Sequence, residues 1–371
     1  MTVAQVCNLC HVSGQILCQE AGDEPPRYGF GSHFCAERAV KGSTVGVSTV
    51  TGFCSRVARA AGFHPVGTAP TYLAHVALEC EVPWAREVTD SATFPAAVGA
   101  VLARAAQDGI EPRVTGLMPD PEYSQAGLTR LFYFTHSDEQ SPVYAKQEFL
   151  IPPAQLPALV ETLLYKQDDL QRFAAYEQDT GGIRELFVCN HGSRDRCCAT
   201  FGFNIYRELR EVYARAQPEG LRVWRCSHLG GHRMAPTLLD LPEGRYYAYI
   251  TAESLPNLVA RKGSFAALDQ QYRGWGRLSP LEQTAEHAVL MAEDWPWTAY
   301  RVKSEVAVSD EDDSRANVTL SYTLPDSSRA GSYRVSVREA AAEQMLTFPS
   351  SCGKEDEPQP QYVVEHIERL L

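Results

Sequence analysis

The sequence predicts an α/β fold made of two similar units in series, followed by a small antiparallel β appendage. Between residues 71 and 263, apolar strands and amphipathic helices occur in an order that repeats once. In each unit a strand, a helix and a second strand precede a strand pair and a covering helix, which is the thioredoxin-like arrangement. After residue 278, strands with alternating apolar and polar residues take over. We therefore predict two consecutive thioredoxin-like domains and an appendage of different character.

The first unit is expected over residues 71–166. Its predicted strands cover residues 71–79, 112–118, 128–136 and 144–151. One helix is predicted over residues 94–109, where apolar residues recur at helical spacing and Gly109 is a suitable C-cap. A second helix over residues 154–166 begins after Pro152 and Pro153, which suit a helix start.

The second unit repeats this order once one strand of the first unit is set aside. Its predicted strands cover residues 183–190, 221–228, 235–241 and 245–250. The predicted helices cover residues 201–216 and 254–263. Because two parallel strands flanking a helix need a right-handed crossover, strands 183–190 and 221–228 should end at the same edge of a sheet.

The appendage begins with a helix predicted over residues 279–294, with Ser279 and Pro280 in the cap and first-turn positions. Three strands are expected to follow, over residues 297–309, 315–324 and 332–340. The acidic run 310–313 is interpreted as a solvated turn between the first two.

Composition limits the classes of function. The chain of 371 residues carries 34 Lys and Arg against 46 Asp and Glu, a net charge of −12. This acidic surplus argues against a protein that coats nucleic acid, which needs clustered positive charge. No window of about 18 apolar residues predicts a membrane span, and the N-terminus lacks the basic start and apolar core of a signal peptide. We expect a cytoplasmic protein, in which thiols stay reduced.

Cysteine and histidine mark the candidate site. The eleven cysteines form an odd number spread over a long chain, which argues against a small disulfide framework. Cys189 ends one strand of the second unit and Cys198 begins its helix, while His228 and His232 follow the parallel strand. These four side chains should therefore meet at one edge of the sheet.

The spacing leaves two metal centres open. Two cysteines and two histidines suit tetrahedral zinc. They equally suit a 2Fe–2S cluster with two thiolates on one iron and two imidazoles on the other. Gly230 and Gly231 lack side chains, so backbone N–H groups can approach an anionic sulfide or thiolate there, which favours the cluster.

Two runs, CNHGSRDRCCATFG from Cys189 and WRCSHLGGHRMAPT from Trp224, carry a resemblance. Together they resemble the sucrase/ferredoxin-like family of thioredoxin-like ferredoxins, whose motif is C-x-H-x-x-R-D-x-x-C followed by H-x-G-G-H. The matching residues are Cys189, His191, Arg194, Asp195, Cys198, His228, Gly230, Gly231 and His232. The run from Phe53 and the SCGK sequence at residues 351–354 resemble further parts of the family. The resemblance covers about residues 51–371 and excludes residues 1–50.

The resemblance implies that Cys189 and Cys198 bind one iron of a 2Fe–2S cluster and that His228 and His232 bind the other. His191 is then expected to hydrogen-bond the site, while Arg194 and Asp195 form a local pair or cap the helix. The implied organisation is an irregular segment over residues 1–50, a thioredoxin-like domain without a cluster over residues 51–170, a ferredoxin domain with the cluster over residues 181–278 and the appendage over residues 279–371.

The expected function is one-electron transfer coupled to proton uptake, since each ligating imidazole keeps a titratable nitrogen. An electron carrier is favoured over a stand-alone enzyme. The alternatives are a zinc-stabilised binding module without redox activity and a reductase that uses the cluster on a small oxidant or a disulfide. No carboxylate pair supports glycoside hydrolysis.

The expected partner is a redox protein that gives or takes the electron. Residues 181–233 hold nine arginines against five acidic residues, which could attract an acidic partner or simply solvate helix faces and offset an anionic cluster. The sequence assigns no oligomeric state. Cys197, Cys226, Cys54 and Cys80 are interpreted as non-ligands, and Cys7, Cys10, Cys18 and Cys35 either form a further metal site or have no such role.

Overall fold

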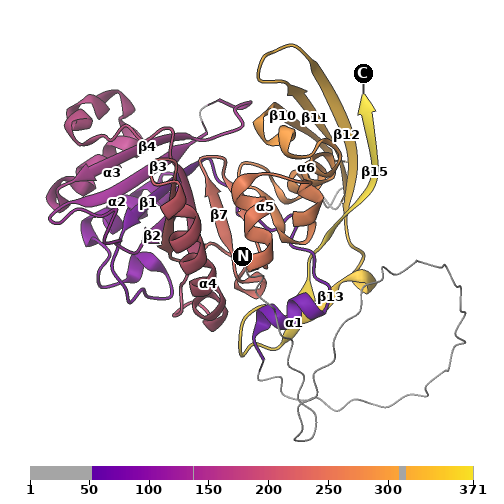
Figure 1. Ribbon diagram of the computed structural model, residues 1–371, viewed down its shortest axis with the longest axis horizontal. Coiled ribbons are helices and arrows are strands. Elements are labelled where there is room, and N and C mark those ends of the chain that lie inside the picture. The colour runs from indigo at the N-terminus through magenta and orange to yellow at the C-terminus, as the bar shows by residue number, and fades with distance from the viewer. Residues whose placement is uncertain (1–51, 137, 309–314, 371) are drawn as a thin grey trace, which may run out of the picture. The chain divides into compact units, whose positions relative to one another are not determined.

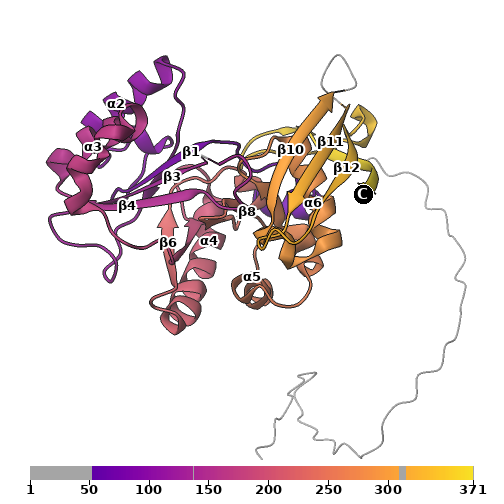
Figure 2. The same cartoon turned by 90° about the horizontal axis from the view of Figure 1, so that it is seen from above.

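The first predicted unit forms four strands with two helices on one face (Figure 2). The computed structural model describes residues 52–136, 138–308 and 315–370, and residues 50–371 form one compact unit. In chain order the elements are β1 (Ala74–Glu79), α2 (Ala96–Gln107), β2 (Arg113–Leu117), β3 (Thr129–Thr135), β4 (Ala145–Ile151) and α3 (Leu156–Tyr165). β1 pairs with β2 in parallel and with β3 antiparallel, and β3 pairs antiparallel with β4.

The second predicted unit repeats this pairing. Its elements are β5 (Arg184–Cys189), α4 (Arg196–Glu208), β6 (Leu221–Cys226), β7 (Leu238–Leu241), β8 (Arg245–Tyr247) and α5 (Leu255–Ala260). β5 pairs with β6 in parallel and with β7 antiparallel, and β7 pairs antiparallel with β8. An additional strand, β9 (Tyr272–Trp275), pairs with β8 and was not expected from the sequence.

One nine-stranded sheet contains both units, in the order β4-β3-β1-β2-β6-β5-β7-β8-β9. The two halves join where Leu117 of β2 pairs antiparallel with Cys226 of β6. The sequence predicts two domains in series; the structure joins the two units in a single mixed sheet.

The two halves face each other across a shared apolar core. On β3, Leu131 packs toward helices α2 and α3, whereas Phe132 points to the opposite face, as the period of two in a strand requires. The ring of Phe132 lies 5.7 Å from that of Trp224 on β6 and 6.1 Å from that of Phe187 on β5. Because β3 is not a sheet neighbour of β5 or β6, these contacts require the half-sheets to pack face to face.

A buried network of charges also joins the halves. Arg222 of β6 forms ion pairs with Glu148 of β4 and with Glu185 of β5. Lys146 lies 2.6 Å from Glu185, and Arg130 pairs with Glu148. Since each carboxylate has at least two cationic partners, this network satisfies charges that burial would otherwise make costly.

The C-terminal appendage is a helix packed on a separate sheet. Helix α6 (Pro280–Glu293) contacts a four-stranded antiparallel sheet whose order is β10 (Arg301–Val308), β11 (Arg315–Thr323), β12 (Ala330–Glu339) and β15 (Tyr362–Leu370). Alternate residues of β11, namely Ala316, Val318, Leu320 and Tyr322, are buried, which matches the predicted half-solvated strands. The acidic run 310–313 lies outside the described residues.

Two terminal elements without a sequence prediction lie side by side. Helix α1 (Cys54–Ala60) packs near the hairpin of β13 (Leu346–Pro349) and β14 (Asp356–Gln359), with Phe63 and Phe348 in ring contact at 5.2 Å (Figure 1). Helix α4 continues as a π-helix over Leu209–Ala214. Short 3-10 helices occupy Val88–Asp90, Pro153–Gln155, Gln167–Tyr176, His232–Met234, Ala252–Ser254, Phe265–Gln271, Trp295–Ala299 and Ala342–Gln344. Among the described residues, no helix has the length and apolar character needed to cross a membrane.

Candidate metal centre

Two thiols and an imidazole meet where β5, β6 and α4 converge. Cys189 ends β5, Cys198 lies in the first turn of α4, and His228 follows β6 by two residues. The two Sγ atoms and a ring nitrogen of His228 all lie within 4.8 Å of one another. The sequence places them there because parallel β5 and β6 end at the same edge. Asp195 caps α4 by accepting the N–H of Cys197 at 2.8 Å, so the helix begins five residues before the predicted start.

His232 lies beside this group without belonging to it. Its ring centroid is 5.3 Å from that of His228. Both ring nitrogens of His232 and Nδ1 of His228 are buried and have no hydrogen-bond partner among the described residues. Buried polar nitrogens are normally satisfied, so these atoms fit a role as metal donors. The donor set therefore suits either metal centre expected from the sequence.

Cys189 is the thiol of this group that ionises readily. Burial opposes its ionisation, but hydrogen bonds from Cys198 and His228 outweigh burial and hold the pKa of Cys189 well below its usual range. The hydrogen bond between Cys198 and Cys189, together with burial, raises the pKa of Cys198. Burial and the nearby Cys189 also raise the pKa of Cys226. Because a thiolate at Cys189 disfavours a second one at Cys198, a cation bound between them would favour ionisation of both.

Gly230 and Gly231 form a turn that only glycine suits. Both have positive φ angles, 82° and 68°. A Cβ at Gly231 would collide with Met234 and lie 3.0 Å from Nη2 of Arg273. Arg273 donates to the carbonyl oxygen of Gly230 at 3.2 Å, and burial lowers the pKa of this arginine to about 9. The turn brings His232 back toward His228 and places a buried guanidinium beside the candidate site.

The first half forms a wall of the site, which the sequence did not predict. The Nε2–H of His191 donates to the carbonyl of Ala85 at 2.7 Å, and its Nδ1 accepts the backbone N–H of His228 at 3.1 Å. Arg194 pairs with Glu87, so it does not form a local pair with Asp195. His191 therefore links the loop after β1 to the backbone of a candidate ligand.

A pocket of about 480 Å³ opens beside His228. Its lining is mostly polar and comes from both halves, including Tyr72, Arg113, His191, Arg194 and His228. Arg113 also donates to the carbonyl oxygen of His228 at 3.2 Å. The candidate site is thus accessible from one side, through a pocket lined by arginines and also by the carboxylates of Glu87 and Glu111.

Two further groups of metal-binding side chains lie outside this centre. The first consists of Cys54, Asp195, Cys197 and Cys352, and the second of His64, Asp269 and His287. From the sequence, Cys54 was expected to be a small buried apolar residue, and Cys198 was preferred over the adjacent Cys197 as a ligand. The resemblance at residues 351–354 was a signal that the C-terminal cysteine matters. Cys7, Cys10, Cys18 and Cys35 lie outside the described residues.

Comparison with known proteins identifies the family. A search of curated proteins found no match, and a search of solved structures found none either. The model of the sucrase/ferredoxin-like family matches residues 65–274, which is more than half of the chain and includes the two thiols and two imidazoles described above. The chain therefore belongs to the sucrase/ferredoxin-like family.

Proposed function

We propose that the chain binds a 2Fe–2S cluster through Cys189, Cys198, His228 and His232 and acts as a one-electron transfer protein. The observation that carries this proposal is the convergence of two thiols and an imidazole, with a second imidazole beside them whose buried nitrogens have no partner. Membership of the family favours the cluster over zinc.

When bound, a 2Fe–2S cluster takes up and releases one electron. The residues around it explain how the protein tunes that property. Two neutral imidazoles in place of thiolates reduce the negative charge of the site, and the buried Arg273 nearby adds positive charge. The second ring nitrogens of His228 and His232 can each hold a proton, so electron uptake is coupled to protonation.

The proposed architecture is a duplicated thioredoxin-like fold over residues 51–170 and 181–278, with residues 279–371 as the appendage. The identical strand pairing of the two halves supports duplication. In this proposal the first half has lost a metal site and instead encloses that of the second half through Ala85, Glu87 and Arg113.

The proposed partner is a cytoplasmic redox protein that docks over the pocket beside His228. The charge available to steer it is smaller than the sequence suggested. At least four of the nine arginines between residues 181 and 233 form ion pairs with carboxylates of the described residues, namely Arg184, Arg194, Arg210 and Arg222. We therefore propose that the positive charge of Arg113, at the rim of the pocket, attracts an acidic partner to this site.

A reductase is the second candidate. The same pocket could admit a small oxidant next to His228, and its volume of about 480 Å³ is that of a small-molecule site. Steady-state reduction of a small oxidant in the absence of any protein partner would favour the enzyme over the carrier.

Anaerobic purification tests the proposal. We expect a red-brown protein with iron and acid-labile sulfide in equal amounts and an electron-spin signal that appears only after reduction with dithionite. Cys198→Ser should abolish the colour, whereas Cys80→Ser should keep it, since Cys80 lies beside Thr93 and belongs to none of the possible metal-binding groups among the described residues. A colourless protein whose bound zinc disappears in Cys198→Ser would contradict the cluster and support structural zinc.

A further inference from the structure

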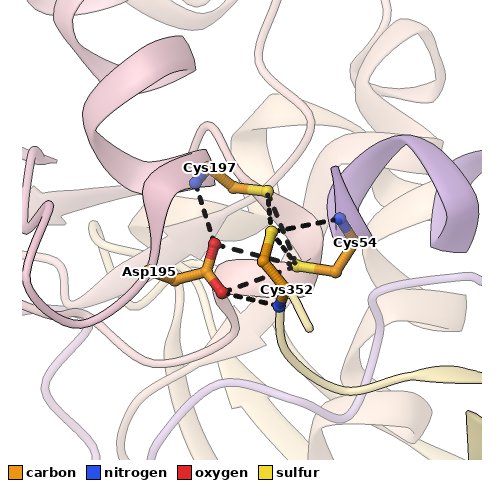
Figure 3. Close-up of side chains that lie close together, drawn as sticks. All are labelled: Cys54, Asp195, Cys197 and Cys352. Carbon is orange, nitrogen blue, oxygen red and sulfur yellow. Dashed lines mark hydrogen bonds between the residues drawn. The ribbon is translucent and has the colours of Figure 1, made fainter. Parts of the chain in front are cut away.

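Three thiols from distant parts of the chain meet beside the N-terminus of α4 (Figure 3). Sγ of Cys54 lies 3.5 Å from Sγ of Cys197 and 3.6 Å from Sγ of Cys352, and Cys197 and Cys352 are 3.3 Å apart. Both carboxylate oxygens of Asp195 lie 3.9 Å from Sγ of Cys54. Cys54 and Cys197 are buried, and Cys352 is partly buried.

The three sulfur atoms form a nearly equilateral triangle, which suits one metal ion. A tetrahedral zinc ion bound at about 2.3 Å by each thiolate holds its sulfurs roughly 3.8 Å apart. The distances between Cys54, Cys197 and Cys352 approach that value on all three sides. A disulfide would instead bring two sulfurs to about 2.05 Å and leave the third unused. The triangle is also compact enough for one ion, whereas ligands of a two-iron cluster occur in two pairs.

Asp195 orients two of the three cysteines. One oxygen accepts the backbone N–H of Cys197 at 2.8 Å, and the other accepts the N–H of Cys352 at 2.8 Å and the hydroxyl of Ser351 at 2.9 Å. Oδ1, which accepts one hydrogen bond from a backbone N–H, keeps a second lone pair for a metal ion, whereas Oδ2 already accepts two. The same carboxylate therefore fixes the backbone on both sides of the triangle and faces its third member, Cys54.

Hydrogen-bond donors and positive charge lie beside two of the three sulfurs, those of Cys352 and Cys197. The backbone N–H of Cys54 points to Sγ of Cys352 at 3.4 Å. The guanidinium of Arg196 interacts with the side chain of Cys352. Cys197 lies in the first turn of α4, a helix of 13 residues whose N-terminus carries partial positive charge that stabilises a negative sulfur.

We propose that Cys54, Cys197, Cys352 and Asp195 bind a structural zinc ion in a closed tetrahedral site. The ion ties helix α1, helix α4 and the loop between β13 and β14 together. It is separate from the proposed cluster, although Cys197 and Cys198 are neighbours, because consecutive residues of a helix point about 100° apart. Sγ of Cys198 belongs to the group with Cys189 and His228.

Metal analysis of variants tests the proposal. We expect protein produced with zinc and purified without chelators to contain equimolar zinc. Cys54→Ser and Cys352→Ser should lose that zinc and keep the visible absorption of the cluster. Cys198→Ser should show the converse, losing the colour and keeping zinc. Cys80→Ser, another buried thiol, is the matched control and should keep both.

Two measurements protect the test against misfolded variants. Cys352→His supplies another zinc donor at the most exposed position and should restore zinc binding. In the unmodified protein, replacement of zinc by cobalt should give the intense visible bands of a tetrahedral thiolate site. Zinc that is absent from the unmodified protein, or lost only in Cys198→Ser, would overturn the proposal. A disulfide between any two of the three cysteines, or iron bound by them, would also overturn it.

Discussion

Leu117 of β2 pairs with Cys226 of β6, and this one bridge joins the two half-sheets two residues before His228. The neighbouring backbone bonds, from Ser227 to Gly116 at 2.8 Å and from Met118 to Arg225 at 2.9 Å, extend the junction on both sides. The candidate metal centre thus lies at the seam between the halves, so movement of one half relative to the other would change the surroundings of His228.

Gly202 is expected to control how closely α4 approaches the site. A Cβ at this position would collide with the carbonyl oxygen of Cys189 and lie 2.6 Å from Nδ2 of Asn190. Gly202→Ala should therefore push α4 and Cys198 away from Cys189, lowering the free energy of unfolding by roughly 1–3 kcal/mol. Denaturant unfolding and iron content measure the two effects.

Gly99 in α2 provides the matched control, since a Cβ there meets no atom within 4 Å. Gly99→Ala should stabilise the protein by roughly 0.5–1 kcal/mol and leave the metal content unchanged. Equal effects of the two substitutions would show that the close contact of α4 with Cys189 is unimportant.

His228→Cys should lower the midpoint potential and weaken its dependence on pH. A thiolate in place of a neutral imidazole adds negative charge to the proposed cluster and removes one titratable ring nitrogen. In the unmodified protein the potential should fall with rising pH by up to about 59 mV per unit where one proton accompanies the electron. Potentiometry across neutral and alkaline pH measures both; a flat profile in the unmodified protein contradicts proton coupling.

Arg222→Met should destabilise the interface between the halves. It leaves the buried carboxylates of Glu148 and Glu185 with fewer cationic partners, and removal of one member of a buried ion pair costs roughly 3–5 kcal/mol. Because Lys146 and Arg130 still pair with these carboxylates, the decrease in the free energy of unfolding should lie near the lower end of that range. Urea unfolding measures it.

The exposed pair of Lys303 and Glu305, 2.8 Å apart on β10, is the control for this experiment. Lys303→Met should leave the unfolding midpoint unchanged within error, because water already screens the pair. If Arg222→Met were equally neutral, the buried network would contribute nothing to the packing of the half-sheets.

His75 should make the protein less stable in mild acid. Burial, helped by the charge of Arg113, holds the pKa of His75 well below its usual value. Below about pH 6.5 the unfolded chain binds a proton that the folded chain does not. The free energy of unfolding therefore decreases by at most about 1.4 kcal/mol for each unit by which the pH is lowered. His75→Phe with Thr115→Val removes this group and its hydrogen-bond partner at 2.8 Å together.

Urea unfolding at pH 7.5 and 5.5 compares the double variant with the parent. The parent should lose more stability between the two values, and the exposed His366→Gln should behave like the parent. An identical pH dependence of parent and double variant would mean that His75 takes up a proton in the folded state.

The pattern of apolar residues along the sequence predicted most of the helices and strands, and it predicted the part of the site that β5, α4 and β6 form. The alternation on β3 and the parallel pair around α4 follow from residues close in sequence, and so does the meeting of Cys189 with Cys198. The face-to-face packing of the half-sheets could not be predicted, because it depends on contacts such as Phe132 with Trp224, which no periodicity reveals.

The same reason explains what was missed at the site. Ala85 and Glu87 are ordinary loop residues, and only the pairing of β2 with β6 brings them to His191 and Arg194. Cys54 and Cys352 are separated by nearly the whole described chain. Strands β13 to β15 lacked a clear expectation because exposed and charged residues dominate β15.

The adjacency of Cys197 and Cys198 has a consequence for biosynthesis. All four proposed cluster ligands have been synthesised once His232 is made, whereas the proposed zinc site needs Cys352, which is made 120 residues later. During that interval Cys54 and Cys197 would lack the third cysteine of the proposed zinc site while the ligands of the proposed cluster are already present. Timely cluster insertion would therefore depend on the supply of iron and sulfide during translation, and the last segment of the chain would seal α1 in place only afterwards.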